Sequence, residues 1–543
     1  MRNLQFHLRL FRSNTQPRLL LQRSSKWSLN GSSRLCQKAA YASVSTAPTF
    51  QSMNGILEPP LLNAIAAMKY VHMTEVQHKV LTDMGDIKSD ALVQAKTGTG
   101  KTIAFLLPAL QNLLTGPKLP HGQVGILIIS PTRELAVQIA EECDRLTASL
   151  PTHVDCHTAF GGTAKAASLK RFMKGNPAVL VATPGRLLDY LSDPSVRKKF
   201  TGIRTVILDE ADTMLESGHL VSVRNILKQI PPKSEGWQGL CFSATLPSRV
   251  RDVVHHILAP GYKHISTIDE NEPPTTANAP QHSIIIPDIK DTFNFIQAFL
   301  QTEYEAAPDN FKAIVFSSTA NSTRLLHDLF IDIIPGMPVY QMQSRMNQSQ
   351  RSKATEGFKV TKKGILFASD VVGRGMDFPN VGLVAQIGLP SSGEQYIHRV
   401  GRTARAGNSG RATILLTKPE SFFLDQNKAL PITPHPESAA IDKKAREVAP
   451  QISRQLQNVD DAVKGKAYAA WFGFNRPLLF NKDKIALVKE GNAFSEAMGN
   501  EVPPAISAKA IGMMGLKGVP GIRIDPTRPQ RARNDQSGGR WQR

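Results

Sequence analysis

The sequence predicts an α/β protein with two doubly wound parallel-sheet domains in tandem, followed by a helical extension. Short runs that are apolar at every position occur five times between residues 91 and 245 and five times between residues 283 and 417. Parallel strands covered by helices on both faces have this uninterrupted apolar character. Segments with helical spacing of apolar residues separate the runs, which is typical of doubly wound sheets. With 543 residues, 41% of them hydrophobic, the chain can form the cores that two such domains need.

The first domain is expected over residues 46–268. Its apolar runs alternate with helical patterns, of which residues 131–146 are the clearest. Each run is too short for a helix of ordinary length and is bounded by turn-forming residues, so each is interpreted as a strand. The predicted strands are residues 91–95, 124–130, 178–183, 204–209 and 239–245.

An acidic, proline-rich segment without periodicity, residues 269–282, is predicted to be a linker. The second α/β domain is expected over residues 283–430 for the same reasons as the first. Its predicted strands are residues 283–288, 312–318, 364–370, 383–389 and 412–417.

After residue 430 we expect strands to stop and residues 431–522 to form a helical extension. Its aromatic residues Trp471, Phe472 and Phe474 lie in a helical pattern, which favours packing anchors over platforms for stacking bases. The last segment, residues 523–543, holds six arginines and two aspartates among Gly, Pro and Gln. It is predicted to be a disordered basic tail whose positive charge suits an anionic partner.

The first 45 residues carry six arginines and two lysines, and the first acidic residue is Glu58. Apolar side chains such as Leu4 and Leu8 keep helical phase with the arginines. This pattern favours a mitochondrial transit peptide over an RNA-binding arm and predicts a location in the mitochondrial matrix. No run of eighteen apolar residues is present, so no membrane span is expected. The formal net charge of +20 favours an anionic partner such as nucleic acid.

A glycine-rich turn between a predicted strand and a predicted helix, residues 95–102, has the pattern of a phosphate-binding loop except that Ala95 replaces its first glycine. Glycines let backbone N–H groups approach phosphates, and the helix N-terminus adds its dipole. Lys101 is expected to reach the β- and γ-phosphates, and the Thr102 hydroxyl is expected to bind Mg²⁺. The residues expected to hold the nucleotide here are Ala95, Lys96, Thr97, Gly98, Thr99, Gly100, Lys101 and Thr102.

Three carboxylates crowd together at residues 209–212, where like charges repel one another. Asp209 ends a predicted strand, and ligands of open α/β sheets bind beyond the carboxyl ends of strands. With a phosphate loop upstream, Asp209 is expected to bind Mg²⁺. Glu210 is then placed to orient or deprotonate an attacking water. The acidic turn alone would be interpreted as a solvated loop.

These motifs, taken in order with others between residues 50 and 420, resemble the DEAD-box RNA helicases of helicase superfamily 2. The resemblance implies RecA-like domains, ATP and Mg²⁺ as cofactors, adenine recognition by Gln77, and Phe50 as the aromatic residue upstream of it. It assigns RNA contacts in the first domain to Pro131, Thr132, Arg133, Gly162, Thr183, Pro184, Gly185 and Arg186, and coupling between ATP and RNA to Asp212, Ser243, Thr245 and His398.

In the second domain the same resemblance places a ribose contact at Asp377 and two arginines, Arg402 and Arg405, at the γ-phosphate. His398 is expected to link this segment to the acidic motif. The family pattern is broken at Thr213 and His219, where an arginine and a phenylalanine are often found. Further RNA contacts are implied for Arg351, Ser369 and Gly375.

The sequence therefore predicts an ATP-dependent RNA helicase and RNA chaperone, an RNA-dependent ATPase that is expected to be monomeric. Residues 467–499 and 514–524 resemble the C-terminal extension of fungal mitochondrial DEAD-box RNA chaperones, so intron splicing, RNA processing and translation are candidate roles. RNA contacts rich in Gly, Ser, Thr and Arg predict binding to the backbone of structured RNA with little sequence specificity. Two alternatives stay open: an ATP-gated RNA clamp that rarely unwinds, and a DNA helicase, which the motif order disfavours.

Overall fold

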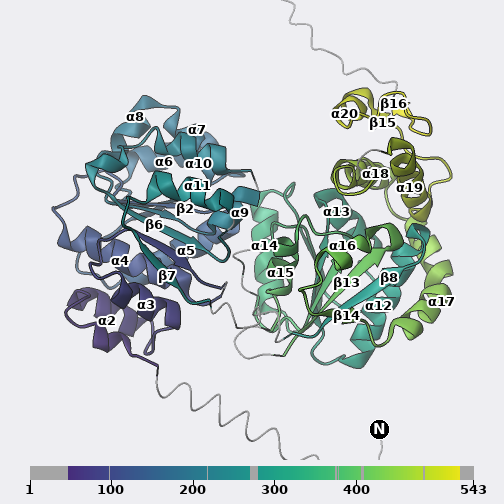
Figure 1. Ribbon diagram of the computed structural model, residues 1–543, viewed down its shortest axis with the longest axis horizontal. Helices are drawn as coiled ribbons and strands as arrows, with labels where there is room; N and C mark the ends of the chain where they lie inside the picture. Colours follow the sequence, from purple (N-terminus) through teal and green to yellow (C-terminus); the bar gives the residue numbers. More distant parts are fainter. Residues whose placement is uncertain are drawn as a thin grey trace, which may run out of the picture. The chain divides into compact units, whose positions relative to one another are not determined.

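Figure 1 shows the computed structural model of the protein, in which helices flank the strands of two separate sheets. The structure describes residues 47–96, 98–216, 218–246, 248–268, 279–372, 376, 378–404, 409–480 and 483–525. Both seven-stranded sheets are parallel throughout, which confirms the predicted doubly wound α/β class. Within the described residues, no helix has both the length and the apolar character needed to cross a membrane.

Domain 1 has the strand order β3-β4-β2-β5-β6-β1-β7. The five predicted strands occupy the middle of this sheet, and two strands that were not predicted, β3 and β7, form its edges. The strands are β1 (Ala91–Gln94), β2 (Ile126–Ile129), β3 (Cys156–Ala159), β4 (Val179–Ala182), β5 (Thr205–Leu208), β6 (Gln238–Ser243) and β7 (Lys263–Ser266).

Two apolar cores cover the two faces of this sheet. Ile126 and Ile128 of β2 point into one core, and Leu127 and Ile129 point into the other, as alternation along a strand requires. The first core takes η1 (Phe50–Met53), α2 (Pro59–Ala67), α3 (Glu75–Asp83), α4 (Lys101–Thr115) and α5 (Arg133–Thr147). The second takes α6 (Lys165–Lys174), α7 (Pro184–Leu191), α8 (Pro194–Arg197), η2 (Lys198–Phe200), α9 (Ala211–Glu216), α10 (Leu220–Leu227) and α11 (Ser248–Ile257).

Domain 2 repeats this topology, because its order β10-β11-β9-β12-β13-β8-β14 is that of domain 1 with every strand number raised by seven. The five predicted strands again lie inside the sheet, and β10 and β14 form its edges. The strands are β8 (Gln281–Ile286), β9 (Lys312–Ser317), β10 (Val339–Met342), β11 (Gly364–Ala368), β12 (Leu383–Ile387), β13 (Arg411–Thr417) and β14 (Ile432–Pro434).

The helices of domain 2 also divide between the two faces of the sheet. One face carries α12 (Thr292–Ala306) and α13 (Ala320–Leu329). The other carries α14 (Gln348–Val360), α15 (Gly393–Val400) and α16 (Phe422–Gln426). Short 3₁₀ turns, η5 (Ile289–Asp291) and η6 (Lys418–Glu420), follow β8 and β13.

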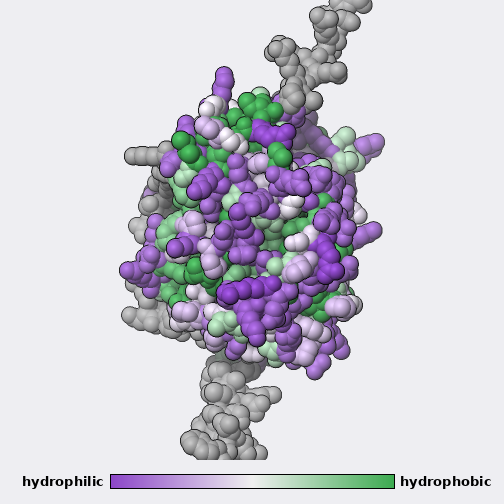
Figure 2. All heavy atoms as spheres, turned by 90° about the vertical axis from the view of Figure 1, so that its right-hand side faces the viewer, coloured by the Kyte–Doolittle hydropathy of each residue, from purple (hydrophilic) through white to green (hydrophobic). Residues whose placement is uncertain are grey.

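The extension packs on the α12–α13 face and shares its core with domain 2. Trp471 is 8% exposed and stacks on Phe494 with ring centroids 6.0 Å apart, and Phe472 is fully buried. These two aromatic residues are therefore packing anchors, as predicted. Figure 2 shows that the face at the right of Figure 1 is mostly hydrophilic, with apolar side chains in small separate groups. The extension consists of α17 (Ser438–Gln457), α18 (Asp461–Asn475), α19 (Lys484–Ala497), α20 (Ala508–Met513), β15 (Ile506–Ser507) and β16 (Ile524–Asp525).

The prediction that strands stop after residue 430 was wrong. The edge strand β14 pairs with β8, and the short strands β15 and β16 pair with each other. The predicted linker, residues 269–282, is also too long at its end, because β8 begins at Gln281. Residues 1–45, expected to be the transit peptide, and residues 526–543, most of the predicted basic tail, lie outside the described residues.

Candidate nucleotide and nucleic-acid site

The predicted phosphate loop lies between β1 and α4, where a parallel sheet presents the carboxyl ends of its strands. Gly98 and Gly100 have φ values of +79° and +88°, a region that side chains disfavour, so the turn requires glycine at both positions. The Lys101 ammonium is buried and donates a hydrogen bond to the Ala95 carbonyl at 3.1 Å. Lys101 therefore bonds back to the residue at which the loop begins. Thr97 lies outside the described residues.

Gln77 is held against this loop by two hydrogen bonds. Its Oε1 accepts the N–H of Thr74 at 2.9 Å within the capping box of α3, and its Nε2 donates to the Gly100 carbonyl at 3.2 Å. A Cβ at Gly100 would stand 2.5 Å from Nε2, so the close approach itself requires glycine. Phe50 is 3% exposed in the core of domain 1, where its backbone N–H pairs with Val71. The structure therefore brings Gln77 to the loop, and the role of Phe50 toward the nucleotide stays a prediction.

Asp209 and Glu210 follow β5 and are both buried. Burial, reinforced by repulsion from Glu210, raises the pKa of Asp209 to about 7, although the Lys101 ammonium acts in the opposite direction. A divalent cation would remove this penalty, and one carboxylate together with the Thr102 hydroxyl suits Mg²⁺, which keeps waters and phosphate oxygens as its other ligands. Accordingly, the described residues contain no cluster of three or more His, Cys, Asp or Glu that could hold a metal alone. The residues fit the predicted ion.

Glu210 has a φ of +50°, which is unusual for a residue with a side chain. Its Oε2 accepts a hydrogen bond from the Thr213 hydroxyl at 3.2 Å. Such backbone strain is found mostly at functional sites, where the surrounding structure holds it in place. The two carboxylates have different hydrogen-bond partners, since Asp209 Oδ1 accepts the backbone N–H of Glu210 at 3.0 Å.

Asp212 joins α9 to the segment that follows β6. Its Oδ2 accepts the backbone N–H of Thr245 at 3.0 Å and the Thr245 hydroxyl at 3.0 Å, and the Asp212 N–H bonds to the Ser243 hydroxyl at 3.2 Å. Nε2 of His398 lies 3.9 Å from the same Oδ2. The four residues predicted to couple the two ligands are therefore together in the structure.

Six of the eight predicted RNA contacts of domain 1 line one hollow of about 370 Å³, and Thr132 and Gly162 are not among its lining residues. Its floor includes Gly161, whose neighbour Gly162 has a φ of +84°. Arg186 is oriented by Thr163, whose carbonyl accepts from the guanidinium at 3.1 Å, and the Thr132 hydroxyl caps α5 through the Leu135 N–H. The lining consists of Pro131, Arg133, Gly161, Thr183, Pro184, Gly185, Arg186, Asp189 and His219.

Replacing Gly162 with Ala is expected to weaken RNA binding about tenfold, because a Cβ there collides with the guanidinium of Arg133. Fluorescence anisotropy with single-stranded RNA measures the change. Gly236→Ala is the matched control, since Gly236 has a φ of +86° but open space around its Cβ position. Equal RNA affinities for the two variants would contradict the placement of Arg133 in the RNA site.

Three of the predicted site residues of domain 2, Arg351, Ser369 and Arg402, are buried. Arg351 is 4% exposed and forms an ion pair with Glu134, and Ser369 is also buried. Arg402 donates to the Met376 carbonyl at 2.8 Å and to the His398 carbonyl at 3.2 Å. Their roles toward RNA and phosphate stay predictions. Gly375, Asp377 and Arg405 lie outside the described residues.

Two residues of the site were not predicted from the sequence. Arg399 is fully buried and forms an ion pair with Asp370 at 2.7 Å, and its guanidinium also donates to Gln386. It thereby ties α15 to the loop after β11. His219, noted only as a departure from the family pattern, lines the RNA hollow, and burial lowers its pKa, which favours the neutral ring. The spacing of Arg399 three residues before Arg402 was the available signal for the first of them.

Comparison with known proteins identifies the family of the chain. The DEAD/DEAH box helicase family matches residues 74–253, and the helicase conserved C-terminal domain matches residues 294–407. The chain is 51% identical to the mitochondrial ATP-dependent RNA helicase MSS116 of Phaeosphaeria nodorum, over 89% of this chain and 88% of the relative. It is 37% identical to DEAD-box ATP-dependent RNA helicase 26 of Oryza sativa, over 86% and 85%.

Among solved structures, Mss116p bound to ssRNA and AMP-PNP aligns with a TM-score of 0.76 and 26% identity, over 89% of this chain and 98% of that chain. A second structure, Mss116 bound to ssRNA and UDP-BeF, aligns with a TM-score of 0.75. Family models, sequence relatives and fold all point to one family. The chain belongs to the DEAD-box family of ATP-dependent RNA helicases.

Proposed function

We propose that the protein remodels structured RNA in the mitochondrial matrix, binding and hydrolysing ATP with Mg²⁺ as an RNA chaperone. The observation that carries the proposal is the meeting of three sites in domain 1. The phosphate loop, the Asp209–Glu210 turn and the RNA hollow all follow strands of one sheet, and Asp212 is bonded to the segment after β6. A change at the nucleotide is therefore positioned to reach the RNA contacts.

For ATP, backbone N–H groups of residues 98–102 and the Lys101 ammonium are proposed to bind the phosphates, and Gln77 the adenine. Thr102 and Asp209 are proposed to hold Mg²⁺, which supplies charge neutralisation of the phosphates when bound. Glu210 orients the attacking water and accepts its proton. Arg402 and Arg405 are proposed to reach the γ-phosphate from domain 2.

For RNA, the glycines and hydroxyl groups around the hollow suit phosphate and ribose oxygens rather than base edges. Arg133 and Arg186 supply the positive charge. Binding of this kind reads little sequence and lets the enzyme act on many structured RNAs. Relatives that share about half of its residues are named mitochondrial helicases, which supports action on mitochondrial transcripts.

A strand-displacement assay separates this proposal from an ATP-gated clamp. The measured quantities are the rate at which a short RNA duplex separates with ATP and the lifetime of the complex with single-stranded RNA. The proposal predicts that ATP separates the duplex faster than the complex with single-stranded RNA dissociates. A long-lived complex without strand separation would favour the clamp, and stronger ATPase stimulation by DNA than by RNA would contradict both.

A basic hollow beside the extension supports the proposed hold on structured RNA. Its lining includes Arg324, Arg345 and Lys466 together with several amide side chains, and it contains no acidic residue. Lys466 comes from α18 and the two arginines come from domain 2. The segment that follows residue 525 holds five further arginines.

Ending the chain after Ile524 is expected to weaken RNA binding and flatten its salt dependence while sparing ATPase activity at saturating RNA. Five arginines are removed. Each phosphate that is no longer neutralised makes the negative slope of log K against log salt less steep by about 0.7. Binding titrations at several salt concentrations measure the slope. The slope of the full chain would be retained if the tail did not touch RNA.

The matrix location depends on residues 1–45, whose arginine-rich pattern is that of a transit peptide. Import into isolated mitochondria of these residues fused to a fluorescent protein tests it, with the arginines replaced by glutamine as the control. Protease-protected fluorescence that survives rupture of the outer membrane is the expected result. Fluorescence that stays outside the inner membrane would contradict the matrix location.

A further inference from the structure

Because the two domains have the same strand order, each strand of domain 2 has a counterpart in domain 1. The phosphate loop follows β1 and the Asp209–Glu210 turn follows β5, so their counterparts in domain 2 are the segments after β8 and β12. Ligands of open α/β sheets bind at the carboxyl ends of such strands. The place in domain 2 that corresponds to the ATP site can therefore be found directly.

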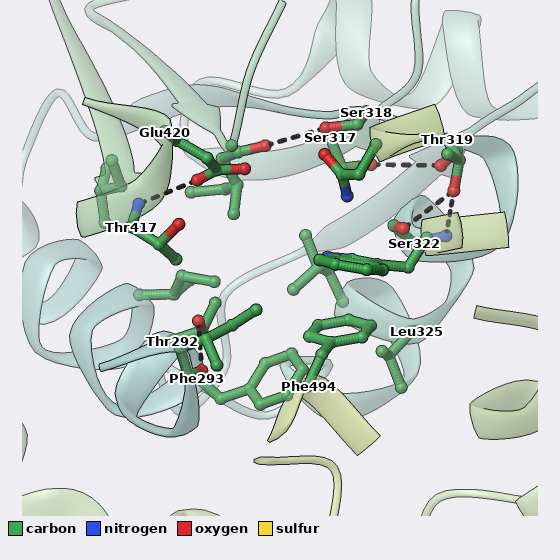
Figure 3. Close-up of a pocket in the computed structure, with 18 of the residues that line it drawn as sticks. Thr292, Phe293, Ser317, Ser318, Thr319, Ser322, Leu325, Thr417, Glu420 and Phe494 are labelled. Atoms are coloured by element: carbon green, nitrogen blue, oxygen red, sulfur yellow. Dashed lines mark hydrogen bonds between the residues drawn. The ribbon is translucent and has the colours of Figure 1, made fainter. Parts of the chain in front are cut away.

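That place contains a cavity of about 70 Å³, drawn in Figure 3. Thr292 and Phe293 at the start of α12, Ser318 after β9 and Thr417 at the end of β13 surround it, and Phe494 of the extension closes it from another side. Trp471 of α18 also lines it. The extension thus covers the counterpart of the nucleotide site instead of leaving it open.

The lining is unsuited to phosphate. No lysine or arginine contributes to it, and residues 287–292 after β8 contain no glycine. Most of the wall is aliphatic or aromatic. An anionic ligand would lose its hydration there without receiving a positive charge, which is costly.

Two buried side chains with hydrogen-bond acceptors also line the cavity. Glu420 is 7% exposed, and its carboxylate accepts the Thr417 N–H at 2.8 Å. Asn475 is 4% exposed and lines the cavity, and its Oδ1 has no hydrogen-bond partner among the described residues. Buried polar atoms without partners are rare in native proteins, and one beside a cavity indicates a missing donor.

We propose that this cavity is a second ligand site, which takes a small neutral molecule with an apolar body and one N–H or O–H donor. Its volume limits the ligand's size: an apolar cavity of about 150 Å³ holds benzene, so this smaller cavity requires a ligand smaller than benzene, such as a five-membered ring or a short alcohol. The donor meets Asn475, and the aromatic and aliphatic walls contact the rest of the ligand. This site lies in domain 2 and is separate from the ATP site.

The ligand site shares a wall with a second cleft, whose lining includes Pro131, Thr132 and Ser369, three of the predicted RNA contacts. Ser318 and Thr319 line the cavity and also border the cleft that contains Ser369, a predicted RNA contact. The Thr319 hydroxyl caps α13 by accepting the Ser322 N–H at 3.0 Å, so this wall is a fixed part of the helix start. Filling the cavity is therefore expected to change the RNA concentration that half-saturates the ATPase, by about fivefold.

Pyrazole, a neutral five-membered ring with one N–H, tests the proposal on the full chain saturated with a non-hydrolysable ATP analogue, which fills the adenine site. Ligand-observed NMR should show saturable binding of pyrazole, and furan, the similar ring without a donor, should bind about tenfold more weakly. Absence of saturable pyrazole binding, or equal binding of furan, would overturn the proposal.

Two variants locate the ligand. Leu325→Phe places a ring in the cavity and should abolish pyrazole binding, whereas Asn475→Leu keeps the volume and should remove the preference for pyrazole over furan. Circular dichroism confirms that each variant is folded, and the wild-type comparison of pyrazole and furan decides the question if one is not. Unchanged pyrazole binding in Leu325→Phe would place the ligand elsewhere and refute the site.

Discussion

Replacing Glu210 with Gln should lower RNA-stimulated ATP turnover by about 10²–10⁴-fold while ATP and RNA still bind. The amide keeps the size of the side chain and can still pair with the Thr213 hydroxyl, so the turn after β5 is preserved. It cannot accept a proton from water. Single-turnover hydrolysis at saturating RNA measures the loss, and nucleotide affinity by fluorescence titration measures what is retained.

Glu235→Gln provides the matched control, because the same chemical change occurs at an exposed glutamate in a 3₁₀ turn of domain 1. It should leave turnover unchanged. Near-normal turnover in Glu210→Gln would refute the role of Glu210. A loss of ATP affinity equal to the loss of turnover would show instead that the substitution disrupts the nucleotide site.

Replacing Phe472 with Ala should destabilise domain 2 by about 3–5 kcal/mol, since the ring is fully buried. It packs edge-on against Tyr468 and Trp471 with centroids 5.1 and 5.4 Å away, and Gly491 of α19 has no side chain because a Cβ there would collide with this ring. The extension and domain 2 share one core, so both should unfold together. Differential scanning calorimetry should show the lower melting transition displaced by roughly 2–4 °C per kcal/mol.

Phe474→Ala on the same helix is the comparison, because Phe474 is only half-buried and should cost less. ATP binding to domain 1 should persist in both variants. If the extension melted alone and RNA-stimulated activity continued above that temperature, the shared core would not be a cooperative unit.

The sequence predicted the interior of both sheets and missed their edges. All ten predicted strands are present, and the four strands of these two sheets that were not predicted, β3, β7, β10 and β14, are their edge strands. Interior strands are buried on both faces and so are apolar throughout, whereas β7 and β14 are largely exposed and their sequences carry no such run. Pattern reading detects burial on two faces, and an edge strand lacks it.

The site followed the same rule. Short motifs predicted the phosphate loop, the acidic turn and most of the RNA hollow, because each chemistry requires particular residues at fixed spacing. The ion pair of Arg351 with Glu134 and the burial of Arg399 against Asp370 were not predicted. Each pair joins segments distant in the chain, and only the folded structure brings them together.

The shared core of domain 2 and the extension sets an order for biosynthesis. The apolar cluster of domain 1 is complete by Ile265, but the cluster of domain 2 runs from Ile284 to Leu516. A ribosome or an import channel delivers the chain from its N-terminus, and domains fold as units when their residues become available. Domain 1 can fold long before the last turn of α20 emerges, while domain 2 must wait for it. A chain that ends before Leu516 would thus keep a folded domain 1 but lack a stable domain 2. Only nearly full-length copies would then contain a folded domain that carries Arg402 and Arg405, the arginines proposed to reach the γ-phosphate.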